Sequence, residues 1–250
     1  MFRQSEESAQ EILHKQEQAW ARKPALRKVY SRYLGLVFQS CRPGITLEIG
    51  AGSGVFKKSG YDVLSTDIEK MVGIDIVSDA QSLPFRDESF ENIIAIDLFH
   101  HLERPVRLLR EARRVLKPGG RLILLEPGIT LVSRWFYHYL HPELVDLDVD
   151  PLEEGSIDVR RHPFDANQGF ATVLVTRARE ALGEAVPGIS VTEHKWIGSL
   201  AYPLSGGFQS WSLVPAVMVG PVLALESLID SMLGRWCAFR LLVILERQSY

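Results

Sequence analysis

The sequence has little cysteine, no excess of basic charge and no uninterrupted hydrophobic run. Its 250 residues include two cysteines, Cys41 and Cys237, and these are far apart and do not show the spacing of metal ligands. Lysine and arginine total 28 against 31 acids, so the basic face typical of nucleic-acid-binding proteins is not indicated. Residues 1–28 are polar and lack the apolar centre of a signal peptide. We therefore expect a reduced, cytoplasmic protein that does not bind nucleic acid.

The least charged segment, residues 197–225, is broken by prolines and polar side chains, which disfavours a transmembrane span. Three interpretations stay open. The segment is core, or it is a lid that moves about Gly206 and Gly207, or it contacts membranes peripherally without spanning them. As a lid it would cover a hydrophobic acceptor, such as a lipid-linked saccharide or an apolar secondary metabolite. The sequence leaves the oligomeric state open.

Short apolar runs that end in an acid alternate with helical patterns, which is typical of an α/β fold with a parallel sheet. We expect one domain over residues 1–250, with helices in 1–42, a cofactor-binding core in 43–127, and substrate-side segments and the last strands in 128–250. Strands are expected at residues 45–49, 61–67, 74–78, 92–97, 121–125, 189–196 and 238–245. Helices are expected at residues 6–20, 26–38, 55–58, 105–115 and 170–182.

A glycine-rich loop follows the first expected strand. Glu48 lies near the end of that strand, and Gly50, Gly52 and Gly54 follow at every second position. Glycine lets a ligand approach the main chain closely, and the N–H groups of the short helix that follows would point at the ligand. The pattern predicts a cradle for a nucleotide-like molecule, with an ordinary tight turn as the alternative. A dinucleotide fingerprint would require glycine or alanine where Val55 stands, which disfavours a nicotinamide-dependent oxidoreductase.

Asp67 ends the second expected strand, about 20 residues beyond Glu48. At this spacing nucleotide-binding α/β folds place a carboxylate on the ribose hydroxyls, since one carboxylate can accept from both. The other interpretation of Asp67 is a helix N-cap, because Ile68 and Glu69 follow it.

Five motifs in a fixed order resemble those of the class I S-adenosylmethionine-dependent methyltransferases, in particular the methyltransferase type 11 group. Between residues 45 and 127 they read LEIGAGSG, TDI, DAQSLPF, IIAIDLFHHL and RVLKPGGRLILLEP. The resemblance implies a Rossmann-like, doubly wound, mostly parallel seven-stranded sheet with an antiparallel last strand, N-terminal helices and a C-terminal apolar cap or insertion. It implies S-adenosyl-L-methionine as the cofactor and methyl transfer to a small organic molecule or glycan, at an O, N or C atom. A methyltransferase-like protein that binds cofactor, or serves only as a partner, is the alternative.

The resemblance assigns cofactor contacts to residues at the ends of four strands. Glu48 and the glycine loop would face the methionine part and the sugar, Asp67 the ribose, and Asp79 with the Ala80 N–H the adenine edge. Asp97 would line the methionine end. The full predicted set is Glu48, Gly50, Ala51, Gly52, Ser53, Gly54, Asp67, Ile68, Asp79, Ala80, Asp97 and Leu98.

His100 and His101 follow the fourth strand, where a histidine could act as a general base near neutral pH. A ring that packs against the next helix is the alternative, and because adjacent side chains diverge, at most one of the two should face the cleft. The aromatic and basic segment 131–141 predicts a substrate wall or an aromatic core, with Arg134, Trp135, Tyr137 and His138 as substrate candidates. Three alternating acids, Asp146, Asp148 and Asp150, are interpreted as a solvated segment, so no metal site is expected.

Overall fold

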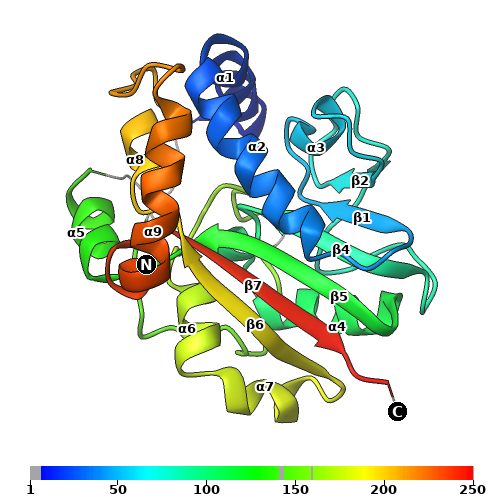
Figure 1. The fold of residues 1–250 in the computed structure, drawn as a ribbon. Helices are drawn as coiled ribbons and strands as arrows, with labels where there is room; N and C mark the ends of the chain where they lie inside the picture. The colour runs from blue at the N-terminus through cyan, green and yellow to red at the C-terminus, as the bar shows by residue number, and fades with distance from the viewer. Residues whose placement is uncertain (1–6, 141–143, 159, 250) are drawn as a thin grey trace.

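The computed structural model describes residues 7–140, 144–158 and 160–249, which form a seven-stranded sheet between two layers of helices (Figure 1). The strand order is β3-β2-β1-β4-β5-β7-β6. Neighbours from β3 to β5 pair in parallel, and β7 is antiparallel to both β5 and β6. The predicted Rossmann-like sheet with an antiparallel last strand is therefore confirmed. The strands are β1 Thr46–Ile49, β2 Leu64–Asp67, β3 Ile76–Val77, β4 Phe90–Ile96, β5 Leu116–Pro127, β6 Ile189–Ile197 and β7 Arg240–Arg247.

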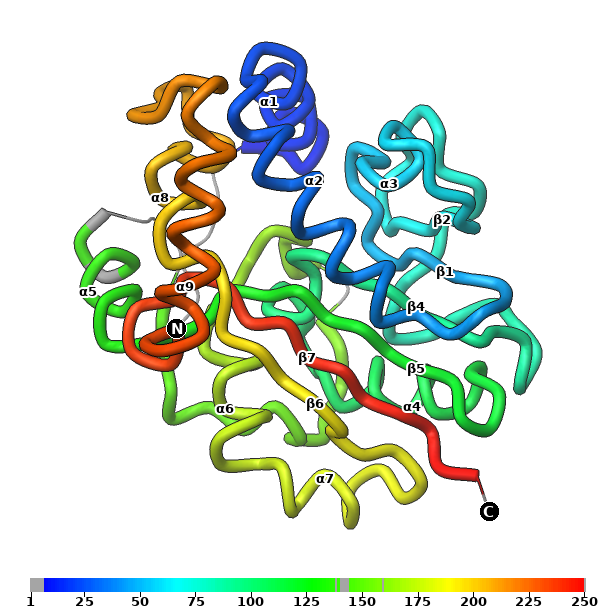
Figure 2. Tube along the Cα trace, viewed as in Figure 1, coloured from blue at the N-terminus to red at the C-terminus, as the bar shows by residue number. Residues whose placement is uncertain are grey.

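The sheet is buried on both faces, because alternate side chains of its apolar strands enter two different cores. In β5, Leu122 and Leu124 pack with α4, α6 and α7, whereas Ile123 and Leu125 pack with α2 and the segment that leads into α9. Figure 2 traces α2 beside α8 and α9 on the second face. The helices are α1 Ala9–Arg22, α2 Pro24–Gln39, α3 Val55–Lys58, η1 Phe99–His101, α4 Pro105–Val115, α5 Leu131–Leu140, α6 Phe170–Thr176, α7 Arg179–Ala185, α8 Ala201–Ser205 and α9 Val219–Cys237.

Two expected elements differ from the structure. The helix predicted over residues 170–182 is two helices, and the break lets α6 pack against β7 and α7 against β6, which are rotated relative to each other by the sheet twist. The strand predicted at residues 121–125 begins earlier, at Leu116, because Leu116 pairs with Phe90 across an irregular register. Within the described part of the chain, no helix combines the length and apolar character needed to cross a bilayer.

The topology fixes where a ligand can bind. The strand order reverses beside β1, since the chain first adds β2 and β3 on one side and then returns to place β4 on the other. At such a switch point the loops after the two central strands diverge and leave a crevice at the carboxyl ends. The glycine loop follows β1, and the two histidines follow β4.

Candidate active site

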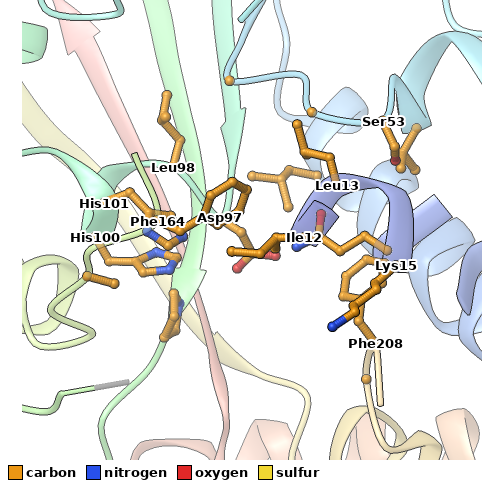
Figure 3. Close-up of a pocket in the computed structure, with 18 of the residues that line it drawn as sticks. Ile12, Leu13, Lys15, Ser53, Asp97, Leu98, His100, His101, Phe164 and Phe208 are labelled. Carbon is orange, nitrogen blue, oxygen red and sulfur yellow. The ribbon is translucent and has the colours of Figure 1, made fainter. Parts of the chain in front are cut away.

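A cavity of about 1280 Å³ lies at this switch point. Figure 3 shows Ser53 of the glycine loop, Asp97 and Leu98 after β4, and the two histidines arranged around it. The cavity is therefore built from loops that follow β1, β2 and β4, three of the four strands at whose ends cofactor contacts are expected. The predicted residues that line it are Glu48, Gly50, Ala51, Gly52, Ser53, Asp67, Ile68, Asp97, Leu98, His100, His101 and Tyr137.

The glycine loop has a backbone that other residues would strain. Gly50, Gly52 and Gly54 have φ values of 63°, 50° and 69°, in the left-handed region. A Cβ on Gly50 would also stand 2.7 Å from Leu98 Cδ1, so this glycine lets the loop and the residues after β4 approach closely. Among the predicted loop residues, Gly54 is the one that does not line the cavity.

Asp67 both braces the loop and faces the cavity. Its Oδ2 accepts the Gly52 N–H at 2.7 Å, and its Oδ1 accepts the Glu69 N–H at 2.8 Å. No helix follows directly after Asp67 in the described structure, so the helix N-cap interpretation is wrong. Each oxygen has a further lone pair for a ligand hydroxyl. Burial raises the pKa of Asp67, although these backbone N–H groups oppose the shift.

Glu48 lines the same cavity and carries an unsatisfied oxygen. Its Oε2 is buried and has no hydrogen-bond partner in the described structure. Burial raises the pKa of this carboxyl to about 8, with Lys57 acting in the opposite direction. A buried carboxylate oxygen without a donor is costly unless a ligand supplies one, so the site fits a ligand that carries a cationic or N–H group here. S-adenosyl-L-methionine carries both an ammonium and a sulfonium group.

Two predicted cofactor residues lie away from the cavity. The Asp79 Oδ1 accepts the Gln81 N–H at 2.8 Å in a turn, and Ala80 is packed in the core. Neither residue lines the cavity, where Ile68 and Glu69 form the adjacent wall. Their role at the adenine edge stays a prediction.

Both histidines line the cavity, so the expectation that at most one could face it is wrong. The tight turn of η1 stacks the two rings with their centroids 4.1 Å apart. His100 is buried, and its Nδ1 lies 2.5 Å from Glu126 Oε2. The other oxygen of Glu126 accepts the N–H groups of Leu98 and Phe99. Glu126, which ends β5 in the LLEP motif, was not among the predicted site residues.

Arg240 and Tyr30 are two further residues of the site that the sequence did not predict. Arg240 Nη1 lies 2.6 Å from Asp97 Oδ1, and the Tyr30 hydroxyl donates to Asp97 Oδ2 at 3.2 Å. The guanidinium is buried and lies over the Tyr202 ring. An arginine at the start of an otherwise apolar strand, in RLLVIL, is the one sequence signal for this cluster.

Helix α5 contributes one of the four predicted substrate residues to the cavity. Tyr137 is buried and its hydroxyl donates to the Phe239 carbonyl oxygen at 3.1 Å. Arg134 and Trp135 lie on the exposed side of α5 and do not line the cavity. The side chain of His138 falls outside the described residues.

Helix α1 and the segment after α8 close the cavity on the remaining side. Figure 3 shows Ile12, Leu13 and Lys15 of α1 opposite the histidines, with Phe208 beside them. The Phe208 ring packs edge-on against Tyr30, with 5.5 Å between centroids. Lys23 Nζ donates to the carbonyl oxygens of Gly207 and Gln209 and so ties this segment to the start of α2. The N-terminal helices thus take part in the cavity wall.

Among the described residues, no group of three or more potential ligands could hold a metal ion. The Oδ1 atoms of Asp146 and Asp150 accept backbone N–H groups two residues ahead, which accounts for them as local turn caps.

Comparison with known proteins agrees with this geometry. Residues 47–124 match the family model described as "Methyltransferase domain". The probable tRNA methyltransferase 9B of Mus musculus is 35% identical over 100 residues, in an alignment that covers 34% of this chain and 22% of that protein. The demethylmenaquinone methyltransferase of Clavibacter sepedonicus is 32% identical over 124 residues, 40% of this chain and 51% of that protein.

These matches span between about a fifth and a half of the relatives' own lengths. A crystal structure titled as an S-adenosylmethionine-dependent methyltransferase, possible histamine N-methyltransferase, from Thermotoga maritima shares the fold. It is 18% identical, with a TM-score of 0.52, over 90% of this chain and 91% of that one. The predicted resemblance is confirmed for residues 47–124, which match a methyltransferase domain, and the chain as a whole shares the fold of that neighbour. The matched domain is of the type 11 group, whose cofactor is S-adenosyl-L-methionine.

Proposed function

We propose that this protein transfers a methyl group from S-adenosyl-L-methionine to a small organic acceptor by in-line displacement. The observation that carries the proposal is Glu48 Oε2, a buried carboxyl oxygen with no hydrogen-bond partner among the described residues, in the cavity that the glycine loop borders. When bound, the cofactor supplies a methyl group that is already activated on sulfur. The protein then needs to hold the acceptor in line and, for a hydroxyl or an acidic carbon, to remove a proton.

Two of the expected cofactor contacts have a matching acceptor in the cavity. Glu48 would accept from the cationic end of the cofactor, and Asp67 would accept from the ribose hydroxyls with the lone pairs that the backbone leaves unused. Gly50 and Gly52 have no side chain, so the sugar could lie against the main chain there. The adenine contact stays assigned to Asp79 and Ala80 by resemblance.

His100 is the better of the two candidate bases. Glu126 is an acceptor for two backbone N–H groups, so the short contact from His100 Nδ1 requires a proton on that nitrogen. In the neutral ring Nε2 is then the acceptor, which is the form that a general base needs. The buried carboxylate also fixes the orientation of the ring. The His101 ring stacks between His100 and Phe164, as a wall residue would.

The cavity wall supports an apolar or aromatic acceptor. Beyond the polar cluster, its lining is rich in aromatic rings: Tyr30, Phe136, Tyr137, Phe164, Tyr202 and Phe208. A net charge of −3 does not favour RNA, although one of the relatives above is a probable tRNA methyltransferase. The cytoplasmic location, the oligomeric state and the acceptor atom stay open to experiment.

The test is methyl transfer with the cofactor labelled on its methyl group. The protein is incubated with three separate extracts: polar metabolites, solvent-extracted lipids and total RNA. We expect label in an organic-soluble product, and less with His100→Asn at equal protein. Label in RNA alone would refute the small-molecule acceptor. Binding of S-adenosylhomocysteine without transfer to any extract would favour the alternative of a cofactor-binding partner protein.

A further inference from the structure

Helix α9 turns its acidic side chains toward the protein and exposes several apolar side chains to solvent, which is the reverse of an ordinary surface helix. Its two acids turn toward the protein: Glu226 is fully buried and accepts the N–H groups of Leu200 and Ala201. Asp230 accepts the N–H groups of Gly198 and Ser199. Surface helices normally place their carboxylates in water and their apolar stripe inside. In α9 the carboxylates hold the connection from β6 to α8. Val219, Val222 and Leu223 pack against the core, whereas Leu225, Leu228, Met232 and Leu233 are exposed.

Exposed apolar residues also lie on α5, which contacts α9, and on the segment that leads into α9. Leu228 and Met232 of α9 are 59% and 72% exposed, and Trp135 of α5 is 62% exposed. Helices α5 and α9 are in contact and lie at the same side of the molecule (Figure 1). We define the α5–α9 surface as Leu131, Val132, Trp135, Tyr139, Trp211, Leu213, Val217, Met218, Leu225, Leu228, Met232, Leu233 and Trp236, all exposed. Scattered apolar residues are ordinary on a surface, whereas a set of this size marks an interaction site.

The charges on these elements have one sign where they face solvent. Over α5, α9 and residues 206–218, the described acids are Glu226 and Asp230, both engaged inward. The basic residues are Arg134 and Arg235, both exposed. The Arg235 guanidinium lies over the Trp236 ring, 4.7 Å from its centroid. Tryptophan, tyrosine and arginine beside exposed leucines are the composition that lies at the boundary of acyl chains and anionic headgroups.

The α5–α9 surface is continuous with the active-site cavity. Trp211 and Leu213 belong to both, since they line the cavity and are exposed to solvent. Phe136 and Tyr137 bring α5 itself to the cavity wall. An apolar molecule leaving a bilayer beneath this surface would thus meet apolar side chains along its path to the histidines.

We propose that the α5–α9 surface docks on an anionic lipid bilayer, with α9 lying in the interface, and that the methyl acceptor enters the cavity from the lipid. The second part rests on the proposed methyl transfer, whereas docking itself does not. A lipid surface fits better than a protein partner, because the exposed charges described on these elements, Arg134 and Arg235, are cationic and the aromatic residues are spread over two helices and a loop. Binding of this kind combines buried apolar area with attraction to anionic headgroups, so it weakens as salt increases.

Vesicle flotation with the full chain tests the proposal. We expect the protein to float with vesicles of phosphatidylcholine and phosphatidylglycerol, less with phosphatidylcholine alone, and less at high salt. Leu228→Gln with Met232→Gln should lower partitioning at least about tenfold, because both side chains leave the acyl region. Arg235→Glu should lower it on anionic vesicles specifically. Val72→Gln is the matched control, since Val72 is 93% exposed in the loop between β2 and β3, at the opposite edge of the sheet.

The outcomes separate docking from catalysis. Binding of S-adenosylhomocysteine, measured by calorimetry, should be equal in the parent and in these variants, which also shows that the variants are folded. Flotation that the double variant retains would overturn the proposal, as would a parent protein that floats with neither vesicle. A dimer in solution that the double variant abolishes, without flotation of the parent, would assign the surface to a second copy instead. Flotation without methyl transfer would leave docking intact and refute only the proposed function.

Discussion

Arg240 and Asp97 form an ion pair that joins the start of β7 to the end of β4, with 2.6 Å between Nη1 and Oδ1. Both residues line the cavity, and the arginine side chain is almost fully buried whereas the aspartate is more exposed. Asp97 also has a φ of 54°, a conformation that asparagine and aspartate tolerate better than most residues. The contact fixes the backbone directly before Leu98 and the histidines, so one wall of the active site depends on a residue at the far end of the chain.

Asp97→Asn should lower the free energy of unfolding by about 3 kcal/mol, because it leaves a buried guanidinium without its counter-ion. Asparagine keeps the shape and accepts the positive φ, so strain adds little. Urea unfolding of the parent and the variant measures the difference. Replacing both residues, in Asp97→Asn with Arg240→Met, should cost less than the sum of the two single changes, and additive costs would show that the pair is not coupled.

Glu48 should give the protein a measurable pH dependence of stability. Its pKa is about 8 in the folded protein against an ordinary value of 4.5, so between these values the folded state holds a proton that the unfolded chain has lost. The free energy of unfolding should therefore fall as pH rises, by up to ~1.4 kcal/mol per pH unit from this group. Glu48→Gln should flatten the dependence. Urea unfolding at about pH 5 and about pH 8 tests this, and parallel curves for parent and variant would contradict it.

Asp67→Ala should weaken binding of S-adenosylhomocysteine by about 1–3 kcal/mol, because it removes ligand hydrogen bonds and a brace of the glycine loop. Calorimetry measures the affinity, with thermal unfolding as the check on folding. Asp62→Ala is the matched control, since Asp62 is an exposed acid just before β2. Asp79→Ala should weaken binding by a similar amount if the adenine edge reaches that turn. Parent-like affinity in both Asp67→Ala and Asp79→Ala would refute the assignment of the strand ends.

His100→Asn should lower kcat by roughly 10²–10⁴-fold for an acceptor that must lose a proton, with cofactor affinity unchanged. His101→Asn should have a smaller effect, because that ring is placed as a wall. Single-turnover assays with labelled cofactor separate chemistry from binding. A larger loss in His101→Asn than in His100→Asn would reverse the assignment, and parent-like rates in both would indicate an acceptor that needs no base.

Chelation should leave methyl transfer unchanged, because the proposed mechanism uses only side chains and the cofactor. Activity is measured with and without EDTA at saturating cofactor. A steep loss that added magnesium restores would instead point to Asp146, Asp148 and Asp150 as ligands.

The sequence by itself determined the sheet and the cofactor half of the site. Apolar runs that end in Glu48, Asp67 and Asp97 follow from local propensity and burial, and the alternation of strands and helices leaves few topologies. The glycine loop is equally local, since three glycines at alternate positions are needed for its left-handed turns. The structure confirms the sheet and shows the left-handed turns of the loop, because neighbouring residues decide both.

Only the tertiary structure decided which side chains meet across the cavity. Glu126 reaches His100, and Arg240 reaches Asp97, because β4, β5 and β7 lie side by side in the sheet, an order that no local pattern specifies. The stacking of His100 on His101 depends on the tight turn of η1. The inward acids of α9 could not be assigned in advance, because a helix can turn either face to the protein. That orientation is set by backbone N–H groups at and just before the start of α8. Glu226 accepts those of Leu200 and Ala201, and Asp230 accepts that of Gly198.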